Sequence, residues 1–260
     1  MRLNWMRATT IGVATAALLS ACATTPPPPP ALGGTPANIV ASVSDRARPP
    51  GDVARDAALR PAQLLAFAGV RPGQRVVDLI PAAGYFTRLL SKAVGPRGKV
   101  YAYVPDELTQ QAARDPAVAQ ITRDPNYANT MLTVRNLSDF VLPERVDLIF
   151  NGQHYHDMKS PILGPVDMRR FNAAAFNALK PGGTYVVVDY IAASGSGARD
   201  AVSLGRVDPA MVVAEVTAAG FTYSGELTIL RDTTDTHTVR GQEGVAGRGD
   251  QFVFRFRKPR

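Results

Sequence analysis

The sequence contains very little cysteine: Cys22 is the only one among 260 residues. A single cysteine excludes an intramolecular disulfide, so an oxidising compartment would add no cross-link within the chain. Long apolar runs are also missing, because the apolar stretch at 11–21 is too short to span a bilayer as a helix. The pattern Gly-x-Gly-x-x-Gly is absent, which argues against a nicotinamide enzyme. No internal repeat is visible.

Basic residues outnumber acidic ones by 29 to 22, which gives a formal charge of +7. They are scattered, and no run of five or six basic residues indicates nucleic acid binding. The densest cluster is "RFRKPR" at 255–260. This cluster fits a basic tail that touches an anionic surface, although a solvated strand end is the simpler interpretation.

The first 21 residues have the pattern of a secretory signal peptide, with Arg2 and Arg7 before a short apolar stretch of small residues. They lead into "LLSAC" at 18–22, which resembles the bacterial lipoprotein box. We therefore expect cleavage after residue 21 and lipidation of Cys22, which would anchor the chain in the bacterial cell envelope, facing the periplasm. Ala23, rather than an aspartate, follows the cysteine, and by the same resemblance this favours the outer membrane. An ordinary cleaved signal with a chance cysteine is the alternative.

Residues 22–37 form the predicted linker between this anchor and a folded domain at 38–260. Five consecutive prolines at 26–30 favour an extended polyproline II spacer. The domain begins with two predicted short helices in 52–69. Asp52 is the expected cap of the first helix, and Pro61 suits the first turn of the second.

Strands and helices then alternate along the chain. The apolar runs predict strands at 74–80, 98–104, 130–137, 145–151 and 184–190, and the intervening segments predict helices at 84–95, 106–115, 167–183 and 208–221. Two further strands, at 222–230 and 250–257, close the chain as a long hairpin. This order predicts an α/β fold with a mostly parallel sheet, an antiparallel edge and helices on both faces.

Four local motifs occur in the order typical of class I S-adenosylmethionine-dependent methyltransferases. They are "VVDLIPAAGYFTRLL" (76–90), "VDLIFNGQHYHDM" (146–158), "LKPGGTYVVVDY" (179–190) and "VVAEVTAAGF" (212–221). The chain resembles that family over roughly residues 45–257, and more narrowly a bacterial group of predicted methyltransferases. The resemblance implies a Rossmann-like, seven-stranded fold and S-adenosyl-L-methionine as cofactor, and no specific substrate comes with it.

The loop after the first strand departs from the family pattern. By the resemblance, Asp78 and Gly84 match the family's acid and its last glycine, whereas Ile80 and Ala82 occupy the first two glycine positions. Pro81 stiffens the turn but removes a hydrogen-bond donor. If position 82 requires a positive φ, alanine costs on the order of 1 kcal/mol there. We still expect Asp78, Pro81, Ala82 and Gly84 to contact the cofactor.

Three more residues are candidates for the cofactor site. The family's ribose-binding acid falls on Val104, so Asp106 is the candidate replacement, with helix capping as its alternative role. Asp139 matches an acid that the family often places near the adenine, although a plain loop acid is an equal alternative. Asn151, at the end of the fourth strand, completes the predicted set.

The three histidines, His154, His156 and His237, are expected at the carboxyl edge of the sheet. A histidine there suits general-base catalysis, because its unperturbed pKa lies near the working pH. We predict that His156 has this role, with His154, Tyr155 and Asp157 beside it, and we predict no metal. Two alternatives remain: a metal site at His-x-His and Asp157, or a structural His156.

The segment 192–208 is rich in glycine and serine and is placed to act as a lid. In the resembling group a histidine precedes the arginine of this loop, whereas Gly205 stands at that position here. Arg206 is a candidate for holding a substrate anion, and Asp208 is explained by helix capping.

Methyl transfer to an unknown small molecule is the function that these features favour. The alternative is a catalytically degenerate methyltransferase fold that serves as a ligand-binding or structural envelope lipoprotein. The predicted location in the cell envelope motivates this alternative, because a lipidated chain faces a compartment with no obvious source of the cofactor.

Overall fold

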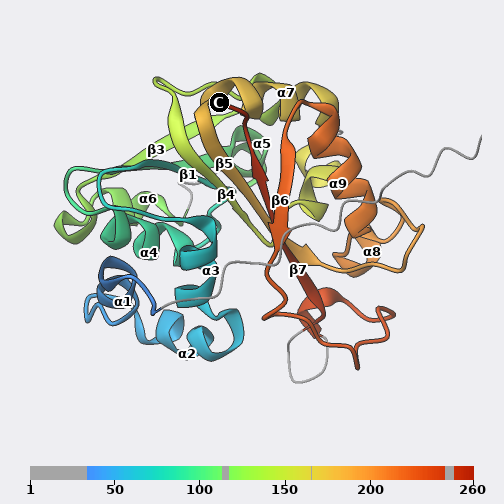
Figure 1. Ribbon diagram of the computed structural model, residues 1–260, viewed down its shortest axis with the longest axis horizontal. Helices are drawn as coiled ribbons and strands as arrows, with labels where there is room; N and C mark the ends of the chain where they lie inside the picture. Colours follow the sequence, from blue (N-terminus) through green and yellow to red (C-terminus); the bar gives the residue numbers. More distant parts are fainter. Residues whose placement is uncertain (1–33, 113–116, 165, 244–248) are drawn as a thin grey trace, which may run out of the picture.

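The computed structural model of the protein describes residues 34–112, 117–164, 166–243 and 249–260. The predicted signal peptide, the lipidation site Cys22 and most of the linker lie outside the described residues. Seven strands form one sheet at the centre of the molecule (Figure 1): β1 (Arg75–Leu79), β2 (Lys99–Pro105), β3 (Thr130–Arg135), β4 (Val146–Gly152), β5 (Leu179–Tyr190), β6 (Thr222–Glu226) and β7 (Gln251–Arg257).

The strand order is β3-β2-β1-β4-β5-β7-β6. β7 pairs antiparallel with both β5 and β6, and the other neighbours pair in parallel. The predicted fold class is confirmed, including the antiparallel pair at one edge. The predicted hairpin of the last two strands is also present.

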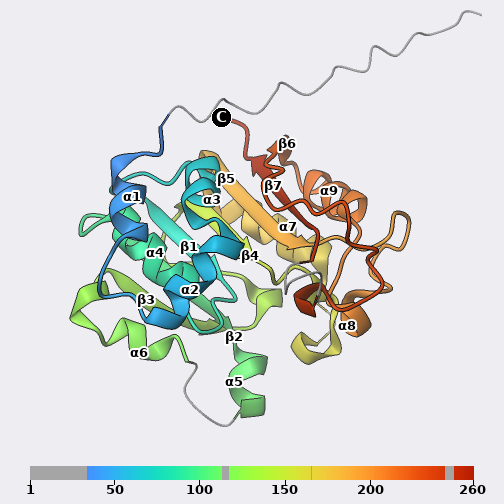
Figure 2. The same cartoon turned by 90° about the horizontal axis from the view of Figure 1, so that it is seen from below.

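Helices cover both faces of the sheet (Figures 1 and 2). On one face, α1 (Ala37–Val43), α3 (Pro61–Ala68) and α4 (Tyr85–Val94) pack on a buried cluster that includes Val76. On the other face, α7 (Met168–Ala178) and α9 (Pro209–Ala218) pack on a cluster that includes Val77. Neighbouring strand residues thus point to opposite layers, which explains why the central strands are apolar throughout. The remaining helices are α2 (Pro50–Leu59), α5 (Asp106–Ala112), α6 (Ala119–Thr122) and α8 (Ala201–Leu204).

Short 3-10 helices complete the fold: η1 (Pro125–Tyr127), η2 (Leu137–Asp139), η3 (His156–Lys159), η4 (Pro161–Leu163) and η5 (Gly241–Glu243). Two local predictions hold, since Pro61 is the first residue of α3 and Asp208 caps α9 by accepting from the Ala210 amide at 2.9 Å. The predicted cap of α2 is wrong. Pro49 occupies that position, and the Asp52 carboxylate instead lies 2.9 Å from the Arg88 guanidinium.

The boundary between α7 and β5 also differs from the prediction. The helix ends at Ala178, and Gly182 and Gly183 belong to the strand. The reason is a pair of backbone hydrogen bonds with Lys258, from the Gly182 amide at 3.0 Å and to the Gly183 carbonyl at 2.9 Å. A partner about 75 residues away in the chain therefore sets this helix end.

A buried ion pair ties the N-terminal helices to the central domain. The Arg48 side chain is fully buried and donates to both carboxylate oxygens of Asp56, at 2.9 and 2.6 Å. The Tyr85 hydroxyl, on the first residue of α4, donates to the same carboxylate at 2.7 Å. Burial works to raise the pKa of Asp56, but the hydrogen bonds from Arg48 and Tyr85 outweigh it and lower that pKa.

Asp56→Asn tests this tie. The substitution leaves the buried Arg48 guanidinium without a charged partner, so we expect a loss of about 3 kcal/mol in unfolding free energy, measured by denaturant titration. Because the pKa of Asp56 is lowered on folding, the wild-type contribution should be present above the ordinary carboxyl range and should disappear as the pH falls below it.

Asp45→Asn is the matched control, because Asp45 pairs with the more exposed Lys92 at 3.4 Å. It should cost less than about 1 kcal/mol. Equal losses of unfolding free energy in the two variants would show that the buried Arg48–Asp56 ion pair stabilises the protein no more than the more exposed pair does.

Candidate functional site

The carboxyl ends of the parallel strands β1, β2, β4 and β5 lie at one edge of the sheet. In open α/β sheets this edge is where ligands bind. Most of the predicted site residues within the described part of the chain lie at the ends of these strands or just after them, whereas Asp139 follows β3. The strand ends and the loops after them form the candidate site.

The β1–α4 loop keeps the backbone of a glycine-rich loop despite its side chains. All three family glycine positions have left-handed φ values: 58° at Ile80, 48° at Ala82 and 81° at Gly84. The Ile80 side chain is 4% exposed and packs in the core, so it does not fill the open side of the loop. The φ of Gly84 favours glycine there, and a Cβ at this position would also require the end of the Ile121 side chain to move. Ala82 is exposed and retains the strained geometry.

Asp78 lies directly beneath this loop, at the end of β1, and is almost fully buried. The Thr87 hydroxyl on α4 donates to one of its oxygens at 2.5 Å. Burial raises the pKa of Asp78 to about 6, although the Thr87 hydrogen bond and the charge of His154 oppose this shift. A desolvated carboxylate of this kind favours a cationic group beside it.

A second acidic pair follows β2. Asp106 and Glu107 open α5, and Asp106 Oδ1 and Glu107 Oε2 are buried without a hydrogen-bond partner among the described residues. The other Glu107 oxygen accepts from the Asn136 amide at 2.5 Å. Burial raises the pKa of Glu107, a backbone hydrogen bond opposes this, and the adjacent Asp106 carboxyl adds to the increase. Two orphaned carboxylate oxygens at this edge are suited to accept from hydroxyl groups.

These groups fit S-adenosylmethionine. Its ribose hydroxyls can donate to the orphaned oxygens of Asp106 and Glu107, and its cationic groups suit the buried Asp78 carboxylate. Glu107 was missed as a site residue from the sequence. The only available signal was that it follows Asp106 directly after an apolar strand.

The other predicted cofactor residues have more local partners. Asp139 is largely exposed and lies 2.7 Å from the Arg170 guanidinium, so its described contact is an ion pair with α7. Asn151 is fully buried and accepts from the His154 amide at 3.2 Å, which shapes the loop after β4. Pro81 is buried within the β1–α4 loop. Cofactor contacts at these three positions remain predictions.

The loop after β4 contains a chain of alternating carboxylates and imidazoles. Asp189, at the end of β5, accepts from the His156 amide at 2.7 Å and contacts His156 Nδ1 at 2.8 Å. His156 Nε2 lies 3.3 Å from Asp157, whose other oxygen contacts His154 Nδ1 at 2.7 Å. Asp189 is fully buried and His156 is 6% exposed, whereas the His154 side chain is 23% exposed.

This arrangement corrects the prediction that His156 is the general base. Burial alone lowers the pKa of His156, but the carboxylates of Asp189 and Asp157 outweigh it and raise the pKa to about 10. Both ring nitrogens face carboxylates within a buried site, so neither is free to take a proton from an acceptor. The structural alternative that we considered for His156 fits these contacts.

His154 is the histidine that the geometry leaves available. Asp157 fixes its Nδ1, so Nε2 is the nitrogen that can face a ligand, and its charge acts on Asp78. A carboxylate that fixes one imidazole nitrogen orients the other for proton transfer.

Tyr155 points away from this edge. Its hydroxyl is buried and donates to Glu215 on α9 at 2.7 Å, and burial raises its pKa well above the usual value. The predicted catalytic role of Tyr155 is therefore wrong.

The segment 192–208 is buried at 205–208 and exposed at 193–195. The Arg206 side chain is fully buried, donates to the backbone oxygens of Val239 and Ile191, and lies 2.8 Å from Asp235. It cannot hold a substrate anion as predicted, because these acceptors occupy its guanidinium. His237 lies in the β6–β7 connection and contacts Asp250 at 3.1 Å, away from the other two histidines. A Cβ on Gly205, whose φ is +60°, would lie 3.3 Å from His156 Nε2.

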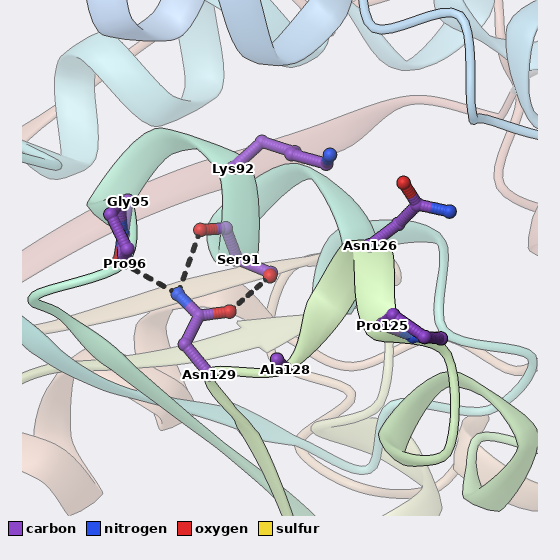
Figure 3. A pocket seen from close by; sticks show the side chains of 8 residues that line it. All are labelled: Ser91, Lys92, Gly95, Pro96, Pro125, Asn126, Ala128 and Asn129. Atoms are coloured by element: carbon purple, nitrogen blue, oxygen red, sulfur yellow. Dashed lines mark hydrogen bonds between the residues drawn. The ribbon is translucent and has the colours of Figure 1, made fainter.

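Within the described residues, no three histidine, cysteine or acidic side chains converge on a point suited to a metal ion. The helices in the described part of the chain include none long and apolar enough to cross a membrane. A cavity of about 340 Å³ lies at the C-terminal end of α4, opposite the candidate site. Figure 3 shows the side chains that line it. There the Asn129 amide donates to the Ser91 and Gly95 carbonyls at 3.0 and 2.8 Å and so closes the helix end.

No family model and no curated protein matches this chain. Among solved structures, it is similar to an S-adenosylmethionine-dependent methyltransferase from Aquifex aeolicus, with a TM-score of 0.56 and 19% identity over 78% of this chain and 92% of that one. A second such methyltransferase, from Mesorhizobium loti, gives a TM-score of 0.51 and 17% identity over 78% and 99% of the two chains.

The [4+2]-cyclase SpnF is also similar, with a TM-score of 0.55 and 16% identity over 80% of each chain. Identities this low concern the fold alone, and a cyclase among these structures illustrates that one fold hosts different reactions. The chain has the Rossmann-like fold of the class I S-adenosylmethionine-dependent methyltransferases.

Proposed function

We propose that this protein binds S-adenosylmethionine and transfers its methyl group to a small-molecule acceptor. The observation that carries the proposal is a loop with left-handed φ values that lies next to buried carboxylate oxygens at the carboxyl edge of the sheet. This site consists of the β1–α4 loop with Asp78 below it and the orphaned carboxylates of Asp106 and Glu107 beside it. The left-handed loop and these two buried carboxylate oxygens occur together at the edge where this fold binds ligands, which supports ligand binding over a purely structural role.

The chain's own residues have three roles in this proposal. Asp106 and Glu107 hold hydroxyl groups of the cofactor, and Asp78 stabilises its positive charge. When bound, the cofactor supplies an electrophilic methyl group. His154, oriented by Asp157, would accept the proton that the acceptor loses on methylation. Alignment of the acceptor with the methyl group supplies much of the remaining rate.

The proposed location is the bacterial cell envelope, with Cys22 lipidated and the domain facing the periplasm. The support is the sequence around Cys22. The Cys22→Ser variant should lose membrane association or remain uncleaved, and unchanged membrane partition and mature mass would contradict the proposal.

Calorimetric titration with S-adenosylmethionine and S-adenosylhomocysteine tests cofactor binding. We expect binding of both, and we expect the affinity for the cationic form to fall as the pH drops below about 6, because Asp78 becomes protonated. Asp78→Asn should weaken binding at least tenfold and remove this pH dependence. Asp124→Asn is the control, because this half-buried carboxylate caps η1, and the variant should bind both compounds as wild type does. If the wild type binds neither compound at millimolar concentration, the proposal fails.

Ala82→Gly tests the strain in the loop. Glycine adopts φ near 48° without penalty, so the variant should be up to about 1 kcal/mol more stable and should bind the cofactor equally or more tightly. The neighbouring Ala83, which is not in the left-handed region, is the matched control. Ala83→Gly should be neutral or destabilising by up to about 1 kcal/mol. The same change in both variants would argue against strain at position 82.

Substitutions of the two histidines should have different effects in a methyl-transfer assay. The assay uses methyl-labelled cofactor and a small-molecule extract of the producing cells. His154→Gln should lower transfer at least about a hundredfold, with an unchanged melting temperature. His156→Gln should lower the melting temperature and lose activity only in proportion to unfolding.

The pH dependence of stability provides a second readout for His156. Because folding raises its pKa from 6.5 to about 10, its contribution is full below pH 6.5 and is lost as the pH rises through about 10. His156→Gln should flatten the stability profile over that range. A His156→Gln variant that is inactive but as stable as wild type would restore His156 as the catalytic candidate.

A further inference from the structure

The edge of the sheet opposite the candidate site is strongly basic. It consists of the starts of β1, β2, β4 and β5, the residues just before them and the end of β7. These segments contain two acidic side chains, Glu144 and Asp147, and nine basic ones: Arg71, Arg75, Arg97, Lys99, Arg145, Lys180, Arg257, Lys258 and Arg260. We call this set the basic edge.

Contacts between strands place these side chains next to each other. Arg75 and Lys99 are register partners and share Glu144, at 2.5 and 3.2 Å. The Lys258 backbone pairs with Gly182 and Gly183 in β5. Burial, and after it the positive charge of Arg145, lowers the pKa of Lys258, which shows that these two cations are within electrostatic reach.

Most of this charge is not neutralised within the protein. Arg71, Arg97, Arg145, Arg257 and Arg260 are exposed, and within the described residues none has a carboxylate at ion-pair distance. The paired members are also accessible, since Lys99 and Lys180 are 50% and 40% exposed. Concentrated like charges repel and cost stability, so their collection at one edge favours an anionic partner.

The candidate site has the opposite polarity, because Asp78, Asp106, Glu107, Asp157 and Asp189 lie at the carboxyl edge. The end of β7 lies at the top of Figure 1, and α8 lies near the lower right. The molecule is therefore electrically polarised along its strands.

The described chain begins close to the basic edge. The Asn38 side-chain amide donates to the carbonyls of Ala93 and Val70, at 2.9 and 3.5 Å. Ala93 lies shortly before Arg97 in the chain, and Val70 directly precedes Arg71. Residues 23–33 separate Gly34 from Cys22, and eleven residues reach at most about 40 Å. A chain attached at Cys22 would thus hold this edge within reach of the membrane.

We propose that the basic edge docks on a bilayer surface of anionic lipid headgroups, with the candidate site facing away from the bilayer. Each arginine or lysine near such a surface strengthens binding about fivefold. The attraction acts over about one Debye length, so it depends on salt.

Vesicle co-sedimentation tests the proposal with the full chain carrying Cys22→Ser, so that no lipid is attached. With its basic edge unaltered, this protein should bind phosphatidylcholine–phosphatidylglycerol vesicles more tightly than vesicles of phosphatidylcholine alone. High salt should remove the difference. Reversal of three unpaired charges, Arg97→Glu, Arg145→Glu and Arg257→Glu, should weaken binding to anionic vesicles about a hundredfold.

The control reverses three exposed arginines outside the basic edge, Arg46→Glu, Arg135→Glu and Arg169→Glu, which changes net charge equally. This control variant should lose less than tenfold in affinity for anionic vesicles, and melting temperatures should confirm that both variants are folded.

Equal losses of affinity in the two variants would show that net charge alone is responsible and would overturn the proposal. It would also be overturned if the edge variant lost oligonucleotide binding but kept vesicle binding, since the partner would then be nucleic acid. Cofactor titration of the edge variant should match wild type, so this test is independent of the proposed enzymatic function.

Discussion

One buried carboxylate, Asp189, organises the candidate site. It is fully buried at the end of β5 and accepts from the His156 amide, the His156 ring and the Tyr190 amide. A buried carboxyl group must find hydrogen-bond donors within the protein, and the loop after β4 supplies two of them. His156 in turn contacts Asp157, and Asp157 contacts His154. The hydrogen bonds that a buried carboxyl group requires therefore set the position of His154, the proposed general base.

The β1–α4 loop illustrates how a fold can tolerate a changed sequence. The backbone at positions 80 and 82 is left-handed although neither residue is glycine. At position 80 the cost is offset because the isoleucine side chain enters the core. At position 82 only one methyl group is added, on the exposed side. The surrounding sheet and α4 over-determine the loop, so the conformation survives the loss of two glycines.

Local patterns in the sequence were sufficient for most of the fold. Central strands such as β1 and β4 are continuous apolar runs because both faces are covered, and Pro61 and Asp208 mark helix starts through local chemistry. The features that could not be predicted depend on distant partners. The end of α7 depends on Lys258, and the protonation of His156 depends on Asp189, 33 residues away. Glu107 escaped notice because its importance lies in an oxygen left without a partner, which only the packed structure reveals.

The close approach of Gly205 to His156 restricts which residues position 205 accepts. A Cβ there would lie 3.3 Å from His156 Nε2, so the imidazole would have to give by a few tenths of an ångström, and the new residue would also have to adopt a left-handed φ. Because His156 lies against Asp157, and Asp157 contacts His154, a displaced imidazole would disturb both neighbours. A glycine in the loop after β5 therefore protects the arrangement of side chains in the loop after β4.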